Sequence, residues 1–152
     1  MNNKRTFLII MILSLLAFIN ASYLSYKAYF FRFIDPNGLS SFCDVSSTFS
    51  CTEVLRHPLS QVFGLSFPWI AFVVYPVLFI IAYFGYRSIK SCSVYAKTLA
   101  GLSFFGVLFN SFIIYREIVF INAYCLLCLL CTVMIVSIFG LSVSIVRTDV
   151  RD

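Results

Sequence analysis

The sequence predicts an all-α membrane protein, a four-transmembrane-helix bundle with an outer loop bearing short interfacial helices. Of its 152 residues, 61% are hydrophobic and 11% are charged. A typical soluble domain has about 45–50% apolar residues and about 25% charged residues. The apolar residues fall into four runs, each near the roughly 20 residues that a helix needs to cross a bilayer. This composition excludes a water-soluble globule, and its 18 Phe and 9 Tyr exclude a disordered chain.

The four apolar runs predict transmembrane helices over about 7–29, 67–86, 98–120 and 123–146. An α-helix is the open-ended structure that satisfies its own backbone hydrogen bonds in lipid. The first run follows Lys4 and Arg5, as a signal peptide would. Its apolar stretch is long for a signal peptide and no convincing small-x-small cleavage site follows, so a retained helix is favoured.

One substantial polar stretch, about 30–66, separates the first two helices and forms the outer loop. Asp35-Pro36-Asn37-Gly38 is a turn signal. Residues 40–59 mix polar and apolar side chains, and they predict one or two short helices that lie on the membrane.

The distribution of Lys and Arg predicts the orientation of the bundle. Four crossings place both termini and the 87–97 loop on one side, which carries seven basic residues: Lys4, Arg5, Arg87, Lys90, Lys97, Arg147 and Arg151. The other side carries four over a longer stretch: Lys27, Arg32, Arg56 and Arg116. Because cytoplasmic loops are enriched in Lys and Arg, we expect cytoplasmic termini. The net charge of +5 then reflects topology, and no nucleic-acid partner is expected.

Five of the six cysteines fall on the predicted outer side: Cys43, Cys51, Cys125, Cys128 and Cys131. Cys92 falls in the predicted cytoplasmic loop. Disulfides persist outside a bacterial inner membrane or in the lumen of the endoplasmic reticulum. Two cysteine pairs on that side therefore indicate thiol–disulfide chemistry.

The Cys125-x-x-Cys128 spacing suits an exchange centre. At a helix start, residues i and i+3 lie on one face, and the free N–H groups stabilise a thiolate. Cys43 and Cys51, on a loop, can swing to meet this pair, since exchange requires direct attack of sulfur on sulfur. Two other interpretations remain open: a four-cysteine zinc site, which membrane embedding disfavours, and structural disulfides in a non-enzymatic bundle. Cys131 is read as a packing residue.

Three stretches resemble the vitamin K epoxide reductase family. They are 43–51 with Val54, 62–65 with Pro68, and Asn122-Ala123-Tyr124-Cys125-Leu126-Leu127-Cys128. The resemblance covers the order of all four helices, and so implies a single domain over 1–152. Bacterial members are similar in role to DsbB, which has the reverse order of cysteine pairs.

The resemblance implies a quinone-dependent thiol oxidoreductase of a bacterial inner membrane, with its redox cysteines on the periplasmic side. A membrane quinone, ubiquinone or menaquinone, is the electron acceptor. The partner is a separate DsbA-like protein of the thioredoxin fold, and the chain itself is expected to be a monomer among membrane lipids. Carried over residue by residue, Cys43 exchanges with the partner, Cys51 relays to Cys125, and Cys128 faces the quinone. No metal is implied.

The chain also departs from the family pattern. Members often have a Ser or Thr near the quinone shortly after the second loop cysteine, where this chain reads Arg56-His57-Pro58. His57 is a candidate for that polar contact or for acid–base work, with a plain interfacial histidine as the alternative. Animal enzymes that reduce vitamin K epoxide have a Tyr where Thr132 stands. Reduction of the epoxide or of a quinone by the same cysteines is thus the alternative function.

Candidate quinone contacts are drawn from the apolar runs and their edges. They are Cys128, His57, Asn110, Phe63, Phe67 and Phe112. Asn110 is a polar group in an apolar helix, where it either binds a quinone carbonyl or joins two helices. Arg116 and Glu117 are expected to anchor the outer membrane interface.

Overall fold

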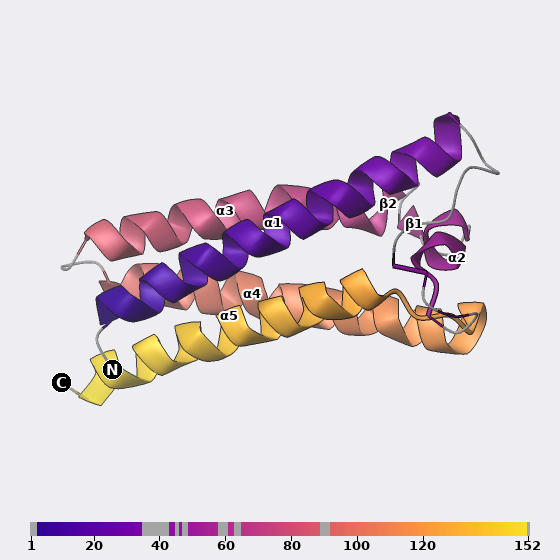
Figure 1. Cartoon of the computed structure of the whole chain (residues 1–152). Coiled ribbons are helices and arrows are strands. Elements are labelled where there is room, and N and C mark those ends of the chain that lie inside the picture. Colours follow the sequence, from indigo (N-terminus) through magenta and orange to yellow (C-terminus); the bar gives the residue numbers. More distant parts are fainter. Residues whose placement is uncertain are drawn as a thin grey trace.

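The computed structural model describes residues 3–34, 43–44, 46, 49–57, 61–62, 65–88 and 92–151. Four long helices run side by side: α1 (Asn3–Phe33), α3 (Phe67–Arg87), α4 (Cys92–Arg116) and α5 (Leu126–Arg151) (Figure 1). Four helical stretches, α4 being extended to Ile121, are long and apolar enough to cross a membrane. The predicted fold class, a four-helix membrane bundle, is therefore confirmed.

The helices extend beyond the predicted spans. The first, expected over 7–29, runs from Asn3 to Phe33, and the third, expected over 98–120, begins at Cys92. Cys92 therefore belongs to a helix and not to the expected 87–97 loop. Hydropathy marks the part of a helix that suits lipid, whereas the helix itself continues through polar residues whose side chains reach the interface.

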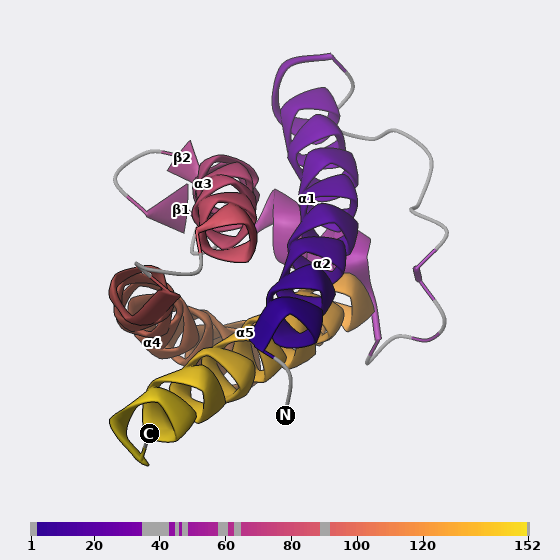
Figure 2. The ribbon, with the colours of Figure 1, turned by 90° about the vertical axis from the view of Figure 1, so that its left-hand side faces the viewer.

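The four helices surround a shared apolar core. Figure 2 looks along the bundle from the end that carries both termini, with α1 beside α3 and α4 beside α5. Small residues such as Ala17, Ala21 and Ala82 are fully buried in this core. Small side chains let membrane helices approach closely, so that van der Waals packing joins them.

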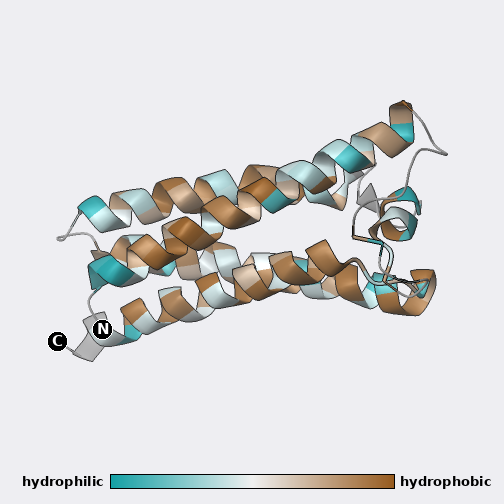
Figure 3. Cartoon of the chain, viewed as in Figure 1, coloured by the Kyte–Doolittle hydropathy of each residue, from teal (hydrophilic) through white to brown (hydrophobic). Residues whose placement is uncertain are grey.

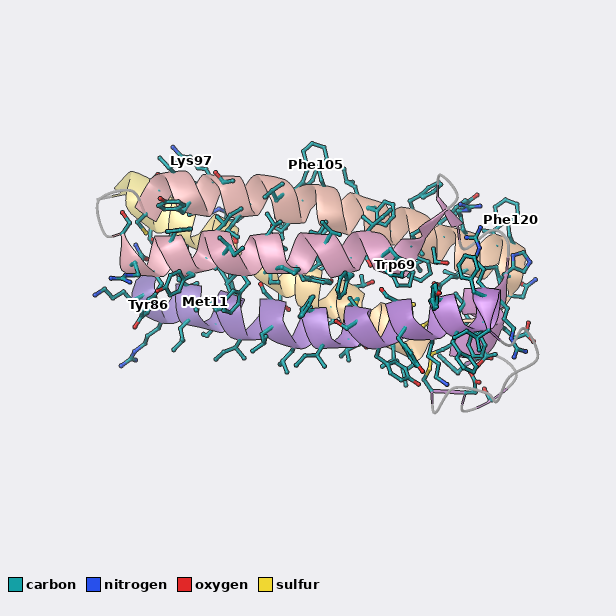
Figure 4. All side chains as sticks on the ribbon, turned by 90° about the horizontal axis from the view of Figure 1, so that it is seen from above. Met11, Trp69, Tyr86, Lys97, Phe105 and Phe120 are labelled. Atoms are coloured by element: carbon teal, nitrogen blue, oxygen red, sulfur yellow. A yellow bond between two sulfur atoms is a disulfide. The ribbon has the colours of Figure 1, made fainter. Side chains whose placement is uncertain are left out.

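Apolar residues are frequent along the middle of the helices (Figure 3), and many of the large ones are exposed on the outside of the bundle. Phe105 is 69% exposed and Phe120 is 56% exposed, and both project away from the bundle (Figure 4). Large exposed apolar surfaces are rare on soluble monomers. With the four long apolar helices, this surface identifies an integral membrane protein.

The end of the bundle opposite the termini carries the short elements (Figure 1). They are the helix α2 (Cys51–Arg56) and the hairpin β1 (Gln61–Val62) and β2 (Leu65–Ser66), in which Val62 pairs with Leu65. The short helix was predicted. The hairpin was not, because strands of two residues are too short to show an alternating pattern. The predicted turn at Asp35–Gly38 lies outside the described residues.

Candidate functional site

The helix α2 is held by a cap that begins beside Cys43. Ser50 is its N-cap, and the Ser50 hydroxyl oxygen accepts the Glu53 N–H at 3.2 Å. The Asp44 carboxylate accepts hydrogen bonds from the Ser50 hydroxyl at 3.0 Å, the Thr52 N–H at 3.0 Å and the Thr52 hydroxyl at 2.5 Å. A capping carboxylate satisfies the free donors of a first helical turn. Asp44 thereby fixes the segment next to Cys43 against the start of α2.

Cys43 and Cys51 form a disulfide, with their Cα atoms 5.9 Å apart. Both residues are buried, with 2% and 0% of their surface exposed. Cys125 and Cys128 are free thiols. Within the described part of the chain, no group of three or more His, Cys, Asp or Glu side chains is arranged to hold a metal ion, and the disulfide takes two sulfurs away from the alternative of a four-cysteine zinc site.

The other cysteine pair is presented by a tight reversal of the chain. After α4 comes a π-helical turn, η2 (Glu117–Ile121), and then Asn122 with φ 54°. Asn adopts this left-handed conformation more readily than most residues. The reversal delays the last helix, which begins at Leu126 and not at the expected 123. Cys125 therefore lies just before the helix.

Cys125 and Cys128 nevertheless face each other. The Cys125 carbonyl accepts the Cys128 N–H at 3.0 Å, and the same N–H lies 3.3 Å from the Cys125 sulfur. The C-x-x-C geometry expected for a helix start is thus kept, although the first cysteine precedes the helix.

A contact between the two segments brings the pairs together. Phe49 and Tyr124 form a backbone bridge, and their ring centroids lie 5.7 Å apart. Phe49 stands two residues before Cys51, and Tyr124 stands next to Cys125. The Cys125 and Cys51 sulfurs lie 3.3 Å apart. Reacting atoms at about 3–3.5 Å are close enough for direct attack, so this contact brings a disulfide and a dithiol within reach of each other.

Cys128 also faces a cavity inside the bundle. Its volume is about 390 Å³, within the range of about 300–1,000 Å³ of small-molecule sites. All four long helices line it, through Ala21, Leu24, Phe67, Pro68, Ile70, Ala71, Val74, Tyr75, Leu102, Phe105, Gly106, Phe109, Asn110, Cys128, Cys131 and Ile135. An apolar cavity with a few polar groups suits a flat, lipid-soluble ring such as that of a quinone.

The polar groups in this cavity are held by neighbouring helices. The Asn110 amide nitrogen donates to the Gly106 carbonyl at 2.9 Å, and its oxygen accepts the Thr132 hydroxyl at 3.4 Å. Asn110 thus joins α4 to α5, which is the helix-joining role, one of the two roles expected for it. The Tyr75 hydroxyl donates to the Cys131 carbonyl at 3.2 Å. A bond from Asn110 to a quinone carbonyl stays a prediction.

Cys131 makes a further contact across the bundle. The Asn20 amide of α1 donates to the Cys131 sulfur at 3.1 Å and to the Leu127 carbonyl at 2.8 Å. Sequence reasoning did not single out Asn20. Its sole signal was a polar amide within the first apolar run, and such groups often join membrane helices.

The predicted quinone contacts do not all reach the cavity. Phe67 lines it with Asn110 and Cys128, whereas Phe63 lies outside the described residues. Phe112 does not line it and is 51% exposed, with Arg116 above its ring at 5.6 Å. The expectation for Phe112 is therefore corrected. Phe112 stands two residues after Asn110, about 200° around a helix that turns about 100° per residue, and so faces outward.

His57 is likewise absent from the lining of the cavity. It ends α2, where its backbone N–H donates to the Glu53 carbonyl at 3.1 Å. The carboxyl end of α2 is the end remote from Cys51. The expectation that His57 supplies a polar contact in the cavity is therefore not met in this conformation.

Glu117 is the functional candidate that sequence reasoning placed wrongly. It was expected to anchor the interface, yet it is 1% exposed. Its Oε2 accepts the Cys125 N–H at 3.4 Å, whereas Oε1 has no hydrogen-bond partner among the described residues. Arg116 points outward onto Phe112, and the next residue, about 100° further round the helix, points inward. The sequence shows a charged pair but not which member is buried.

These features define a membrane protein whose fold places a disulfide, a dithiol and an apolar cavity in contact, which is the arrangement of a thiol oxidoreductase. Residues 8–143 match the model of the vitamin K epoxide reductase family, and the chain belongs to this family. A search of curated proteins finds no match. Proteins of this family are quinone-linked oxidoreductases, so the chain is an oxidoreductase by membership.

Proposed function

We propose that this protein oxidises a DsbA-like protein of the thioredoxin fold and passes the electrons to a membrane quinone, so that it supports disulfide formation outside the cytoplasm. The observation that carries the proposal is the 3.3 Å contact between the Cys51 and Cys125 sulfurs. It links a disulfide at the end of the bundle to a dithiol whose second member, Cys128, lines the cavity.

The cycle conserves atoms and electrons. The thiolate of the reduced partner attacks the Cys43–Cys51 disulfide at Cys43, and the partner's second thiolate then releases the partner as a disulfide. Cys43 and Cys51 are left reduced. The Cys51 thiolate next attacks Cys125 of an oxidised Cys125–Cys128 pair. Cys43 then re-forms its bond to Cys51, and Cys125 and Cys128 remain as a dithiol. That last state has the pairing described above.

A quinone in the cavity would accept two electrons and two protons and become a quinol. The chain's own residues fit its ring: Phe67 and Phe109 supply apolar walls, and the Asn110 amide and the Cys128 thiol supply polar groups. The second N–H of the Asn110 amide would donate to a ring carbonyl. Cys128 lies within α5 and lines the cavity, whereas Cys125 precedes the helix, which supports Cys128 as the thiol nearer to a lipid-soluble acceptor.

Exchange with the partner requires that Cys43 become accessible. Its residue is 2% exposed while the Cys43–Cys51 disulfide is formed and the Asp44 cap is intact. We therefore propose that the partner displaces the segment around Cys43 as it docks. Cys43 then exchanges with the docked partner, whereas Cys51 exchanges with Cys125 inside the protein.

The redox end is proposed to face the periplasm, with both termini in the cytoplasm. The excess of basic residues on the side of the termini supports this orientation. Disulfide chemistry belongs to the oxidising side of the membrane, which is the side opposite the termini in this arrangement.

Trapping of the partner tests the proposal. In Cys51→Ser, the free Cys43 thiolate attacks the disulfide of an oxidised DsbA-like protein and displaces the partner's other thiolate. No Cys51 thiolate is present to release the partner from Cys43, so a mixed disulfide should accumulate on non-reducing gels. Cys92→Ser, which changes a cysteine at the other end of the bundle, should trap no adduct and keep full turnover. Absence of the adduct in Cys51→Ser, with a folded protein, would favour a bundle with purely structural disulfides.

Vitamin K epoxide reduction is tested by a separate assay arm. Thr132 donates its hydroxyl to the Cys128 carbonyl at 3.0 Å and also contacts Asn110, so it is engaged between helices. We expect no product from the epoxide with dithiothreitol, under conditions in which a quinone is reduced. Turnover of the epoxide would establish the alternative function.

A further inference from the structure

A buried carboxyl group stands against the C-x-x-C motif and has no part in the cycle above. Glu117 begins η2 and is 1% exposed. Its Oε2 accepts the Cys125 N–H at 3.4 Å, and the carboxyl group also interacts with the Cys128 thiol. Its Oε1 is buried and lacks a partner among the described residues. Burying an ionisable group with an unsatisfied oxygen is energetically unfavourable, so its presence beside the motif calls for an explanation.

Exchange at this centre needs a group that carries a proton. Cys51 and Cys125 are fully buried and Cys128 is 3% exposed. Each exchange step creates a thiolate as leaving group, and bulk water does not reach these sulfurs. A thiolate formed at Cys128 therefore needs a proton donor within the protein.

Asp44, the other carboxyl group near the cysteines, is committed elsewhere. Both of its oxygens accept hydrogen bonds, from the Ser50 hydroxyl, the Thr52 N–H and the Thr52 hydroxyl. Glu53 of α2 is exposed, and His57 stands at the end of α2 away from Cys51. Of the described carboxyl groups, Glu117 is the one that is both buried and in contact with the motif.

We propose that Glu117 is the proton donor and acceptor of the Cys125–Cys128 pair, an inference that rests on the proposed relay. As the Cys51 thiolate attacks Cys125, the Cys51–Cys125 bond forms and the Cys125–Cys128 bond breaks. The electron pair leaves on Cys128, and the Glu117 carboxylic acid gives that sulfur its proton. When the dithiol is next oxidised, Cys128 returns the proton to Glu117 and two electrons leave to the acceptor.

The substitution Glu117→Gln tests this role. Gln keeps the size of the side chain and an oxygen that can accept the Cys125 N–H, but it holds no transferable proton. We expect turnover with a reduced DsbA-like protein and a ubiquinone analogue to fall by about 100-fold, since general acid–base groups contribute about 10²–10⁴-fold. The matched control Glu53→Gln removes an exposed carboxylate from α2 and should retain the wild-type rate. Wild-type turnover of a folded Glu117→Gln protein would overturn the proposal.

Two further measurements extend the test, and the second does not depend on the folding of Glu117→Gln. Glu117→Asp keeps an acid, so it should turn over at least tenfold faster than Glu117→Gln; equal rates would mean that the side chain only fills space. In the wild-type protein, an infrared difference spectrum can compare the disulfide and dithiol forms of Cys125 and Cys128. The disulfide form should show the carbonyl band of a protonated carboxylic acid. Absence of that band would also overturn the proposal.

The cysteine variants separate this inference from the proposed function. If Cys128→Ser retains turnover, the relay itself is wrong. If Cys128→Ser is inactive while Glu117→Gln turns over like the wild type, the relay stands and the role of Glu117 is wrong.

Discussion

At the scale of single residues, three residues that are not cysteines bring the reacting sulfurs together. The Phe49–Tyr124 bridge joins the two segments, and Asn122 turns the chain so that Cys125 reaches it. The sequence predicted that the four cysteines share a face. It did not predict the bridge, because a single isolated backbone pairing leaves no periodic pattern in the residues around it.

Asn110 is predicted to bind the quinone as well as to join two helices. Asn110→Leu removes the amide that lines the cavity and also breaks the bond to Thr132, whereas Thr132→Val breaks the same bond and leaves the amide in place. Loss of one hydrogen bond of about 1.4 kcal/mol is a tenfold change in affinity. We expect KM for a ubiquinone analogue to rise about tenfold in Asn110→Leu and little in Thr132→Val. Equal KM values in the two variants would assign Asn110 to helix packing alone.

At the scale of elements, α2 is docked onto α1 by a stacked cation. The Arg56 guanidinium lies over the Phe31 ring at 4.7 Å, and such pairs contribute about 0.5–1 kcal/mol at exposed sites. Arg56→Gln should therefore increase local opening of α2 about two- to fivefold, measured by hydrogen exchange of its amides. Arg32→Gln is the control, because Arg32 stacks on Phe33 of the same helix. Unchanged exchange in both variants would show that the stack does not hold α2.

The packing of α1 on α3 depends on a glycine at the end of the bundle near the termini. A Cβ atom added at Gly85 would overlap the ring of Phe7, whereas one added at Gly140 of α5 would meet nothing within 4 Å. Overpacking of this kind typically costs about 1–3 kcal/mol. We expect Gly85→Ala to lower the melting temperature in detergent and Gly140→Ala to leave it unchanged or raise it. A melting temperature of Gly85→Ala equal to that of the wild type would show that Phe7 shifts freely.

Elements were predictable to the extent that they repeat a simple pattern. Four runs of apolar residues indicated four helices and their order, because lipid demands a long apolar helix for each crossing. The boundaries were less predictable. The start of the last helix moved to Leu126 because of the left-handed Asn122, and Phe112 turned outward because the rotation of α4 is set by its neighbours.

At the scale of the whole molecule, the bundle brings together groups that are distant in sequence. Cys51 and Cys125 are separated by 74 residues, and the cavity beside Cys128 has walls from all four long helices. The cysteines were found from the sequence because thiol chemistry needs a rare residue in pairs. Glu117 was not found from the sequence, because its burial depends on the reversal after α4, and no local sequence pattern predicts that reversal.

The central proposal is that electrons pass from Cys43 and Cys51 through Cys125 and Cys128 to a quinone. The most direct measurement is quinone reduction by the purified protein in liposomes, with a reduced DsbA-like protein as donor and a ubiquinone analogue or menadione as acceptor. We predict one quinol for each partner disulfide formed in the wild-type protein and in Cys92→Ser, and none in Cys128→Ser. Full turnover by Cys128→Ser, or partner oxidation without quinol, would contradict the account.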